Sequence, residues 1–503
     1  MKTKFNLIKK QTLDMVSFGL GARVLLFIKG ILIAFYIGSS YNTDVYLLAF
    51  SASMLFTAVI GEGLIVSLIP ILQQVDKRDG MKGRLEFTNN AINNSILLSI
   101  ILMILGFIGA PLIIRLMGPG FKGEEFLHTV KLFRIGLPII CFNFIRTICG
   151  GYLQSQHKFK AGAKSGIANN LIYIIYLTIF SKKFGLEGLM ITGIIAVIAQ
   201  VAVLVSAMNK GGYKYYFEFT LKSRTFQRLI TFLIPISIAI GINEINTVVD
   251  NAIASFLPSG TIATLSYANG IIQLVLGLFV ITIVSALFPL LTESFNQKLH
   301  GDLNDNIKFG FKLLSILIIP VSIVFITLSQ HIVRAVYERG QFGHEATIQT
   351  AKILQLYAVG LISMGLILLI IRIYYAIHDT ITPMKIALIA LPLNAGLSII
   401  FVQFIGVGGL ALGTSISVII TSILGIYDLN KKLKLFETIK VTKDFFIIII
   451  AALVMGALII IIKNNLGPIL NDTLGQEIAL LFLSIGAGIS VYWTILNKFK
   501  ILD

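Results

Sequence analysis

Long apolar segments alternate with short polar connections along the whole chain. About fourteen of these segments are long enough for a helix to cross the hydrocarbon core of a bilayer, which takes about 20 residues. The pattern predicts an all-α polytopic membrane protein with about 14 transmembrane helices. The predicted spans are residues 15–38, 44–72, 91–117, 131–153, 165–182, 186–209, 226–250, 261–292, 308–330, 350–377, 384–404, 408–429, 444–463 and 477–497.

Composition supports this prediction and excludes other classes. Of the 503 residues, 56% are hydrophobic and 13% are charged, whereas about 25% of the residues of a soluble protein are charged. So few charges do not cover a water-facing surface of this size, which excludes a soluble enzyme, a secreted disulfide scaffold and a disordered protein. Cys141 and Cys149 both lie in an apolar stretch, and we interpret them as packing residues.

The net charge of +17 is concentrated on one side of the predicted membrane. Most of the 41 basic residues fall near the termini or in every second connection, such as Lys77 to Arg84 and Lys431 to Lys443. Cytoplasmic loops are rich in Lys and Arg, so both termini are predicted to be cytoplasmic. The same rule explains the charge without nucleic acid as a partner. The first apolar segment has the length of a span, and we expect it to be retained.

The chain also repeats itself. Residues 185–204 and 406–425 share glycines, a leucine and a valine at equal spacing, and IVSLIPIL at 65–72 returns as IVSALFPLL at 283–291. Two matches in the same order predict two six-helix lobes, which are residues 1–215 and 216–435. Residues 436–503 then form a C-terminal helix pair. Six helices per lobe give parallel repeats, an architecture of transporters with a central site between the lobes.

Cations inside predicted spans are the first candidates for a binding site, because charges in a membrane are costly and usually face a cavity or a partner. Arg23 and Lys29 lie in the first span, about 9 Å apart along the helix axis. We interpret them as a site for an anionic substrate; the alternative is a pair of structural cations bonded to carbonyls. Arg146, one turn from Asn143, is a third candidate.

Acidic and amide residues form a second group of candidates. Asp44 and Glu62 are five helical turns apart in the second span and point the same way. We interpret both, together with Glu244 in the seventh span, as gating or coupling residues, with a salt bridge to a first-span cation as the alternative for Glu62. Asn269 and Gln273 in the eighth span are candidate substrate contacts or interhelical hydrogen bonds.

Four oxygen-bearing residues raise the hypothesis of a cation site. Asp250 belongs to the seventh span, Asn394 and Ser398 share a face of the eleventh, and Thr414 lies on the twelfth. Hard oxygen ligands of this kind suit a small cation such as Na⁺. No cofactor is expected beyond coupling to Na⁺ or H⁺. The sequence lacks a Walker A motif and long extramembrane segments, so an ATP-driven pump is not expected without a partner ATPase.

Several ordered segments together resemble one family. These are ARVLLFIKGILIAFYIGSSYNTDVYLLAF (22–50), GEGLIVSLIPIL (61–72), GPGF (118–121), DNAIASFLPSGTIATLSYANGIIQLVLGLF (250–279), YERGQF (337–342) and RIYYAIHDTITP (372–383). Over roughly residues 15–430 the chain resembles the MurJ (MviN) lipid II flippases of the MOP exporter superfamily.

The resemblance implies a transporter that moves an undecaprenyl-diphosphate-linked saccharide, a peptidoglycan precursor, to the outer leaflet by alternating access. Its setting would be the bacterial cell membrane, with membrane lipids and cell-wall synthesis proteins as partners. The family's cavity carries four cations: Arg23 matches one, Lys29 replaces a second, and Thr57 and Gly270 stand where the other two would be. The resemblance also places a Na⁺ site at Asp250, Asn394 and Thr414, with Ser398 where an Asp can occur, and a groove for the lipid tail on the last two helices.

Three alternatives to lipid II transport stay open at this point. The missing cations leave room for a flippase of another lipid-linked glycan, of the O-antigen, exopolysaccharide or teichoic type. A multidrug antiporter of the related MATE type would share the two-lobe plan, but its cationic substrates call for an acidic cavity and twelve helices. A membrane scaffold or glycan-processing enzyme would need a larger outer loop than the short ones near 330–350 and 463–477. A transporter, not an enzyme, is therefore expected.

Overall fold

The protein is described by a computed structural model. It covers residues 2–221, 223–297, 299–433, 441–467, 469 and 473–501; within them, the side chains of residues 2–17, 62, 235, 238–240, 242, 243, 300, 441 and 442 are not described. Every regular element in this part of the chain is a helix. The chain divides into two compact units, residues 1–263 and 264–503.

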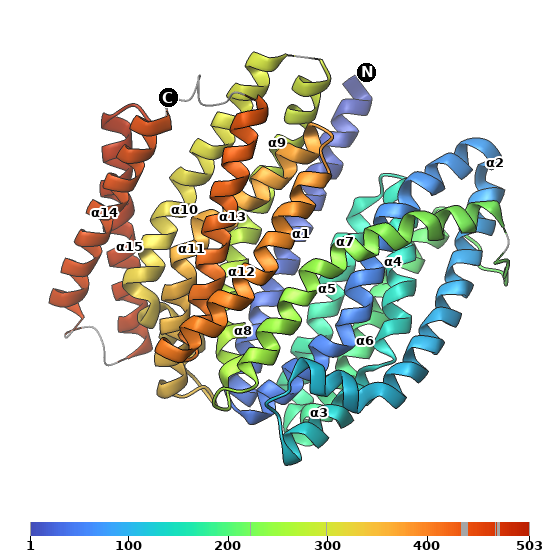
Figure 1. Ribbon diagram of the computed structural model, residues 1–503, viewed down its shortest axis with the longest axis horizontal. Helices are drawn as coiled ribbons and strands as arrows, with labels where there is room; N and C mark the ends of the chain where they lie inside the picture. Colours follow the sequence, from blue (N-terminus) through green and yellow to red (C-terminus); the bar gives the residue numbers. More distant parts are fainter. Residues whose placement is uncertain are drawn as a thin grey trace. The chain divides into compact units, whose positions relative to one another are not determined.

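The first unit holds seven α-helices and one π-turn among its described residues (Figure 1). They are α1 (Lys2–Ile37), α2 (Tyr41–Met117), α3 (Gly123–Gly136), α4 (Ile139–Ser155), α5 (Phe159–Ile175), η1 (Tyr176–Phe180), α6 (Ser181–Lys210) and α7 (Arg224–Ala254). Helix α8 (Thr261–Val275) begins at the end of this unit. The described part of the second unit continues with η2 (Leu276–Val280), α9 (Ile281–Asn296), α10 (His300–Tyr337), α11 (His344–Ala376), α12 (Ile381–Ile405), α13 (Gly408–Leu433), α14 (Val441–Leu466) and α15 (Leu474–Lys498).

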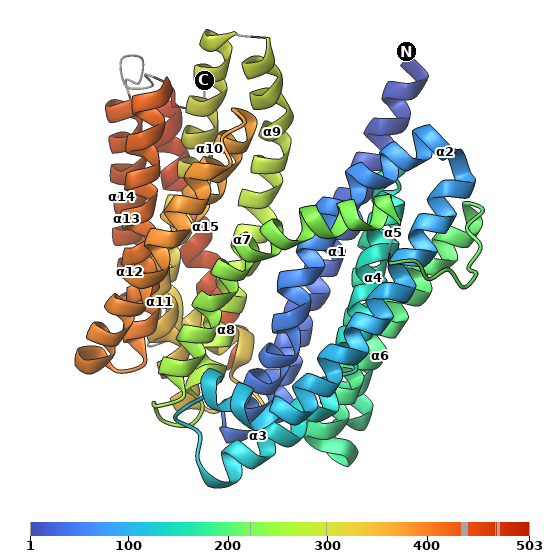
Figure 2. The same ribbon diagram turned by 45° about the vertical axis from the view of Figure 1, so that its right-hand side comes forward.

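Two of the longest helical runs contain a glycine with non-helical backbone angles. Gly80 in α2 has φ 63° and ψ −153°, and Gly185 in α6 has φ 54° and ψ −144°. Residues other than glycine rarely adopt this conformation. At Gly80 the 77-residue run turns, and Figure 2 shows α2 doubling back. The spans predicted at 44–72 and 91–117 therefore lie on the two arms of one bent helix.

The described helices confirm a polytopic membrane protein. Ten of them are long and apolar enough to cross a membrane, or eleven when α3 and α4, bent by 42°, count as one span. Two of these ten, Tyr41–Met117 and Phe159–Lys210, include the glycine breaks and are long enough for two crossings each. The total of 14 spans and the lobe boundaries at residues 215 and 435 stay predictions.

Each unit packs around its longest helices. In the first unit, α2 contacts α3, α4 and α7, while α5 lies between α1 and α6. In the second unit, α10 contacts α11 and α14, α12 pairs with α13, and α14 pairs with α15. Small residues allow close approach between helices in a membrane, as where Gly360 on α11 meets Ser415 on α13.

Within the second unit, a buried carboxylate also joins the C-terminal helix pair to α10. Glu477, in the first turn of α15, is 1% exposed. One of its oxygens lies 2.5 Å from His331 Nδ1, and the other accepts a hydrogen bond of 3.0 Å from Arg334 Nη1; both partners are on α10. A buried charge is tolerated when it is paired and hydrogen-bonded in this way. The clamp ties the start of α15 to the end of α10.

Candidate functional site

Helix α1 presents its two cations in different surroundings. The Nη1 atom of half-buried Arg23 is buried, and no other described residue bonds to it. Lys29 Nζ lies 4.1 Å from the centre of the Tyr173 ring on α5, a cation–π contact. Asn170 Nδ2 donates a 2.9 Å bond to the carbonyl of Ala22, which holds α5 against α1. Arg23 therefore has an N–H group free to donate a hydrogen bond, while the ammonium group of Lys29 contacts the face of the Tyr173 ring.

Arg146 on α4 is connected to α2 through a short relay. Its Nε donates a 3.0 Å bond to Asn143 Oδ1, and Asn143 Nδ2 lies 3.7 Å from Met54 Sδ. Thr57 Oγ1 donates 2.8 Å to the carbonyl of Met54 and is also 3.7 Å from its sulfur. The relay links the Arg146 cation to the turn of α2 that holds Thr57, the position where the family resemblance implies an Arg.

The carboxylate of Asp44 is buried at the start of α2 and binds backbone. One oxygen accepts 2.6 Å from the N–H of Gly260, and the other accepts 2.7 Å from the N–H of Ala263. Ser39 Oγ adds a 3.0 Å bond to the carbonyl of Gly260. Because the N-terminus of a helix attracts anions, the first turn of α8 is a favourable partner for this carboxylate. We call these four residues the Asp44 clasp. Glu62 lies on α2 too, and its side chain is outside the described part of the chain.

The polar residues predicted on α7 and α8 are partly exposed. Glu244 and Asp250 on α7 are half-buried. Asn269 and Gln273 are exposed on one face of α8, and Gln273 Nε2 donates 3.4 Å to Asn269 Oδ1. This pair leaves hydrogen-bonding surface available to a ligand.

Three of the four candidate Na⁺ ligands lie together in the second unit. Ser398 Oγ is 3.3 Å and Thr414 Oγ1 is 3.4 Å from Asn394 Oδ1, so the three oxygens converge between α12 and α13. Thr414 makes its shorter bond, 2.9 Å, to the carbonyl of Leu410. Asp250 belongs to residues 1–263, and the Na⁺ site as a whole stays a prediction.

The segment RIYYAIHDTITP forms the turn between α11 and α12. Asp379 Oδ1 accepts the N–H groups of Ile381 and Thr382 at 3.1 and 3.0 Å, which caps α12. Lys432 Nζ lies 2.8 Å from Asp379 Oδ2. Burial alone would raise the pKa of Asp379, but the bonds from Lys432 and Thr382 outweigh it and hold that pKa below its usual range. This aspartate is thus an ionised cap that ties α12 to α13.

Comparison with known proteins identifies the family. The family described as "Lipid II flippase MurJ" matches residues 33–468 of this chain. The chain belongs to the MurJ lipid II flippase family. It is therefore a multi-pass membrane protein of a transporter family, as the sequence predicts.

Related MurJ proteins cover nearly the whole chain. A probable lipid II flippase MurJ of Rhizobium tropici is 26% identical over 95% of this chain and 91% of its own length. The corresponding protein of Buchnera aphidicola subsp. Baizongia pistaciae is 26% identical over 88% and 87%. A solved lipid II flippase MurJ in an inward closed conformation has a TM-score of 0.81 and 28% identity, covering 98% of each chain.

A MATE multidrug transporter shares the fold. An inward-facing MATE structure of the MOP superfamily matches 85% of this chain and 99% of its own, with a TM-score of 0.72 and 14% identity. At that identity the likeness shows the fold alone.

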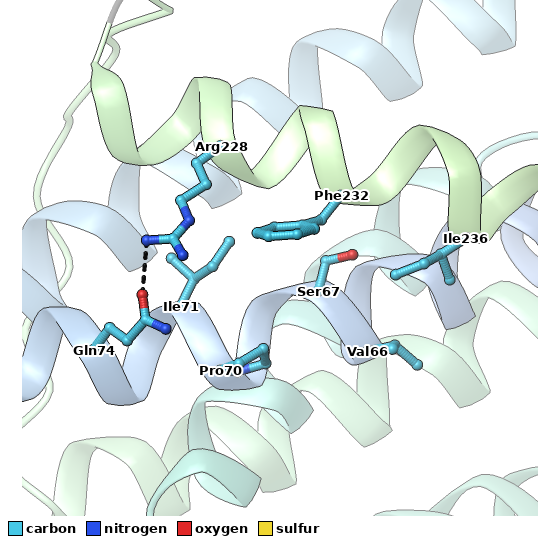
Figure 3. A pocket seen from close by; sticks show the side chains of 8 residues that line it. All are labelled: Val66, Ser67, Pro70, Ile71, Gln74, Arg228, Phe232 and Ile236. Carbon is cyan, nitrogen blue, oxygen red and sulfur yellow. Dashed lines mark hydrogen bonds between the residues drawn. The ribbon is translucent and has the colours of Figure 1, made fainter. Parts of the chain in front are cut away.

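The structure adds features that hydropathy does not reveal. Tyr173 under Lys29, and the backbone N–H groups around Asp44, carry no sequence signal of their own. A groove between α2 and α7 is another such feature (Figure 3): at one end of it Arg228 Nη1 donates 2.8 Å to Gln74 Oε1, beside an apolar lining that includes Ile71 and Phe232. None of the predicted site residues whose side chains are described lines this groove.

Proposed function

We propose that this MurJ-family protein moves lipid II from the inner to the outer leaflet of the bacterial cell membrane by alternating access. The observation that carries the proposal is the match, over 98% of both chains, to a lipid II flippase MurJ in an inward closed conformation. The half-buried cations of α1 supply the chemistry, because lipid II presents a diphosphate between its polyprenyl tail and its sugars.

Three cations on α1 and α4 would bind the diphosphate. Arg23 has a buried N–H group that no described residue uses, and a charge-assisted bond to a phosphate oxygen would satisfy it. Lys29 would turn from the Tyr173 ring towards the anion. Arg146, held by Asn143, would supply positive charge near Thr57 and so replace the cation that α2 lacks.

Movement of the anion outward would run with the membrane potential. Each charge that crosses gains about 2.3 kcal/mol per 100 mV, and the inside-negative potential favours outward transfer of a negative head group. Return of the empty cationic site would run with the same field.

The Asp44 clasp would act as the outer gate. It joins the α1–α2 turn to residues 260–263, at the end of α1 that the distribution of Lys and Arg places outside the cell. These bonds are short and buried, so they would stabilise the state that is closed to the outside. Outward opening would have to break them, and the resulting cost would keep the gate shut until substrate binds.

The test is complementation of a bacterium depleted of its own lipid II flippase. We expect the wild-type chain to restore lipid II in the outer leaflet. The Arg23→Gln, Lys29→Gln double variant should lower transport by at least about 100-fold, since each lost charge-assisted bond costs about 1.5–3 kcal/mol. The matched control replaces one Arg and one Lys whose side chains are exposed, Arg115→Gln with Lys183→Gln, and should transport normally.

Two results would overturn the proposal or change the substrate. Full transport by the double variant would contradict diphosphate binding by α1. Failure of a well-inserted wild-type chain would favour the second candidate, a flippase of another lipid-linked glycan. The observation behind that candidate is that Thr57 and Gly270 occupy two positions where the family resemblance implies cations.

A further inference from the structure

The connection between α6 and α7 is an irregular strap held to α2. Residues 213–220 form neither helix nor strand. Three asparagines of α2 bind this segment along its length, namely Asn89, Asn90 and Asn93. We call residues 213–221 the strap and the three asparagines the ladder.

The ladder uses both its amide nitrogens and its oxygens. Asn90 Nδ2 donates 2.9 Å to the carbonyl of Thr220, and its Oδ1 accepts 2.7 Å from the N–H of the same residue. Asn93 Nδ2 donates 2.9 Å to the carbonyl of Glu218, and its Oδ1 accepts 2.8 Å from the hydroxyl of Tyr215. Irregular backbone needs such partners wherever water is scarce, because unpaired N–H and C=O groups are costly there.

The ladder sets the height of the strap relative to the membrane. Just after Asn94, α2 exposes large apolar side chains at Leu97, Ile100, Ile101 and Ile104. An exposed apolar face on a membrane helix marks the lipid-facing hydrocarbon zone. The strap is bonded to the turns directly before this face, so it lies at the boundary between hydrocarbon and water.

Aromatic side chains cover one side of the strap. Phe217 is 76% exposed, Phe219 is 41% exposed and Leu221 is 54% exposed. The rings of Phe217 and Phe219 are nearly parallel, at 13°, with centroids 6.5 Å apart, so these two side chains lie together. Large apolar groups in this position are unfavourable in water and favourable in the interfacial layer of a bilayer.

Positive charge accompanies this aromatic face. Lys210 ends α6, Lys214 lies in the strap and Arg224 begins α7, and all three side chains are exposed. The head groups of anionic lipids attract basic residues beside a membrane surface, while aromatic rings insert among them. Both features match a lipid surface better than a soluble protein partner.

We propose that the strap is a membrane anchor. Phe217, Phe219 and Leu221 insert into the head-group layer of the cytoplasmic leaflet, and Lys210, Lys214 and Arg224 bind its anionic phospholipids. The ladder transmits this anchorage to α2, so the lipid surface fixes the point at which α7 starts. The side of the membrane follows from the predicted orientation; the anchorage does not depend on which substrate is transported.

Tryptophan fluorescence of the full chain in vesicles tests the proposal. Trp493 is the single tryptophan of the sequence, so Trp493→Phe gives a silent background into which Phe217→Trp is introduced. In vesicles of brominated phosphatidylglycerol and phosphatidylcholine we expect this tryptophan to be quenched. Tyr216→Trp is the matched control: Tyr216 is 38% exposed where Phe217 is 76% exposed, so a tryptophan there should be quenched about twofold less.

Two further variants separate the parts of the anchor. Vesicles that contain phosphatidylglycerol should quench the tryptophan more than vesicles of brominated phosphatidylcholine alone, and replacing Lys210, Lys214 and Arg224 by Gln should remove this difference. Asn90→Ala with Asn93→Ala should lower quenching in both kinds of vesicle. Emission at long wavelength that aqueous iodide quenches and brominated lipid does not would overturn the anchor. Blue-shifted emission without quenching by brominated lipid would also overturn it, and would indicate a protein covering the strap. None of these fluorescence measurements requires transport, so their outcome does not depend on whether the proposed function is correct.

Discussion

At the scale of single residues, the structure shows how hydrogen bonds stabilise the buried carboxylate of Asp44. A carboxylate inside a predicted span is unfavourable unless it has a partner, and the sequence offers Asp44 no cation at hand. Its partners are the backbone N–H groups of Gly260 and Ala263. Backbone donors carry no side-chain signature, so the sequence indicates that Asp44 matters but not what it binds.

Asp44→Asn should destabilise the protein by about 1–3 kcal/mol, because the amide keeps one acceptor oxygen and loses the charge that favours a helix N-terminus. The thermal midpoint in detergent measures this change. Asp76→Asn is the control on the same helix: Asp76 pairs with Arg84 at 3.0 Å and is 43% exposed, so its loss should cost about 0–1 kcal/mol. Equal shifts for both variants would show that the Asp44 bonds contribute nothing special.

For the remaining site residues too, the sequence predicts contacts within one helix but not contacts between distant segments. Spacing predicts that Asn394 and Ser398 share a face, and Ser398 Oγ lies 3.3 Å from Asn394 Oδ1. Spacing within one helix is a local property, which is why it can be read from sequence. Tyr173 under Lys29 joins α5 to α1, and no local pattern specifies a contact between segments so far apart.

At the scale of elements, hydropathy locates spans but not the bends within them. Residues 261–292 are predicted as one span, and the structure divides them among α8, η2 and α9. Residues 131–153 likewise become α3 and α4, which are bent by 42°. A π-turn or bend leaves the apolar composition unchanged, because it shifts backbone hydrogen bonds and not side-chain polarity. Glycine and proline are the only local hints.

Gly80→Ala tests the principal bend of α2. With φ 63° and ψ −153°, an alanine there is strained even though nothing lies within 4 Å of its Cβ, and we expect a loss of about 1–3 kcal/mol. Gly109→Ala is the matched control at a position of the same helix with helical backbone angles, where the Cβ would meet only Ile113 Cδ1 at 3.9 Å. It should be neutral or stabilising by up to about 1 kcal/mol. A Gly80 variant as stable as the control would show that the bend needs no glycine.

At the scale of the whole molecule, composition and the distribution of charge carry the most information. The polytopic fold follows from mean hydropathy and segment length alone, since no other structure buries so much apolar surface with so few charges. The two compact units divide at residue 263, whereas the sequence repeat places the lobe boundary at residue 215. The two boundaries differ because α7, which the prediction assigns to the second lobe, packs on α2 in the first compact unit.

Orientation is the whole-molecule property that only charge predicts. Gly301 lies in the first turn of α10 and Gly343 follows the end of this helix, and the 37 residues from Gly301 to Tyr337 extend about 55 Å at 1.5 Å per residue. This length exceeds the hydrocarbon thickness of about 30 Å, so the two glycines lie on opposite sides of the membrane. The excess of Lys and Arg predicts that Gly301 is inside and Gly343 outside.

Single cysteines decide between the two orientations. Both glycines are exposed, and an added Cβ meets nothing within 4 Å at either position. In a background with Cys141→Ala and Cys149→Ala, a membrane-impermeant maleimide should label Gly343→Cys in intact cells, and Gly301→Cys only after the membrane is opened. Because the two residues bound the same helix, each variant is the control for the other. The reverse pattern would invert the whole molecule, place the Asp44 clasp on the cytoplasmic side and move the strap to the outer leaflet.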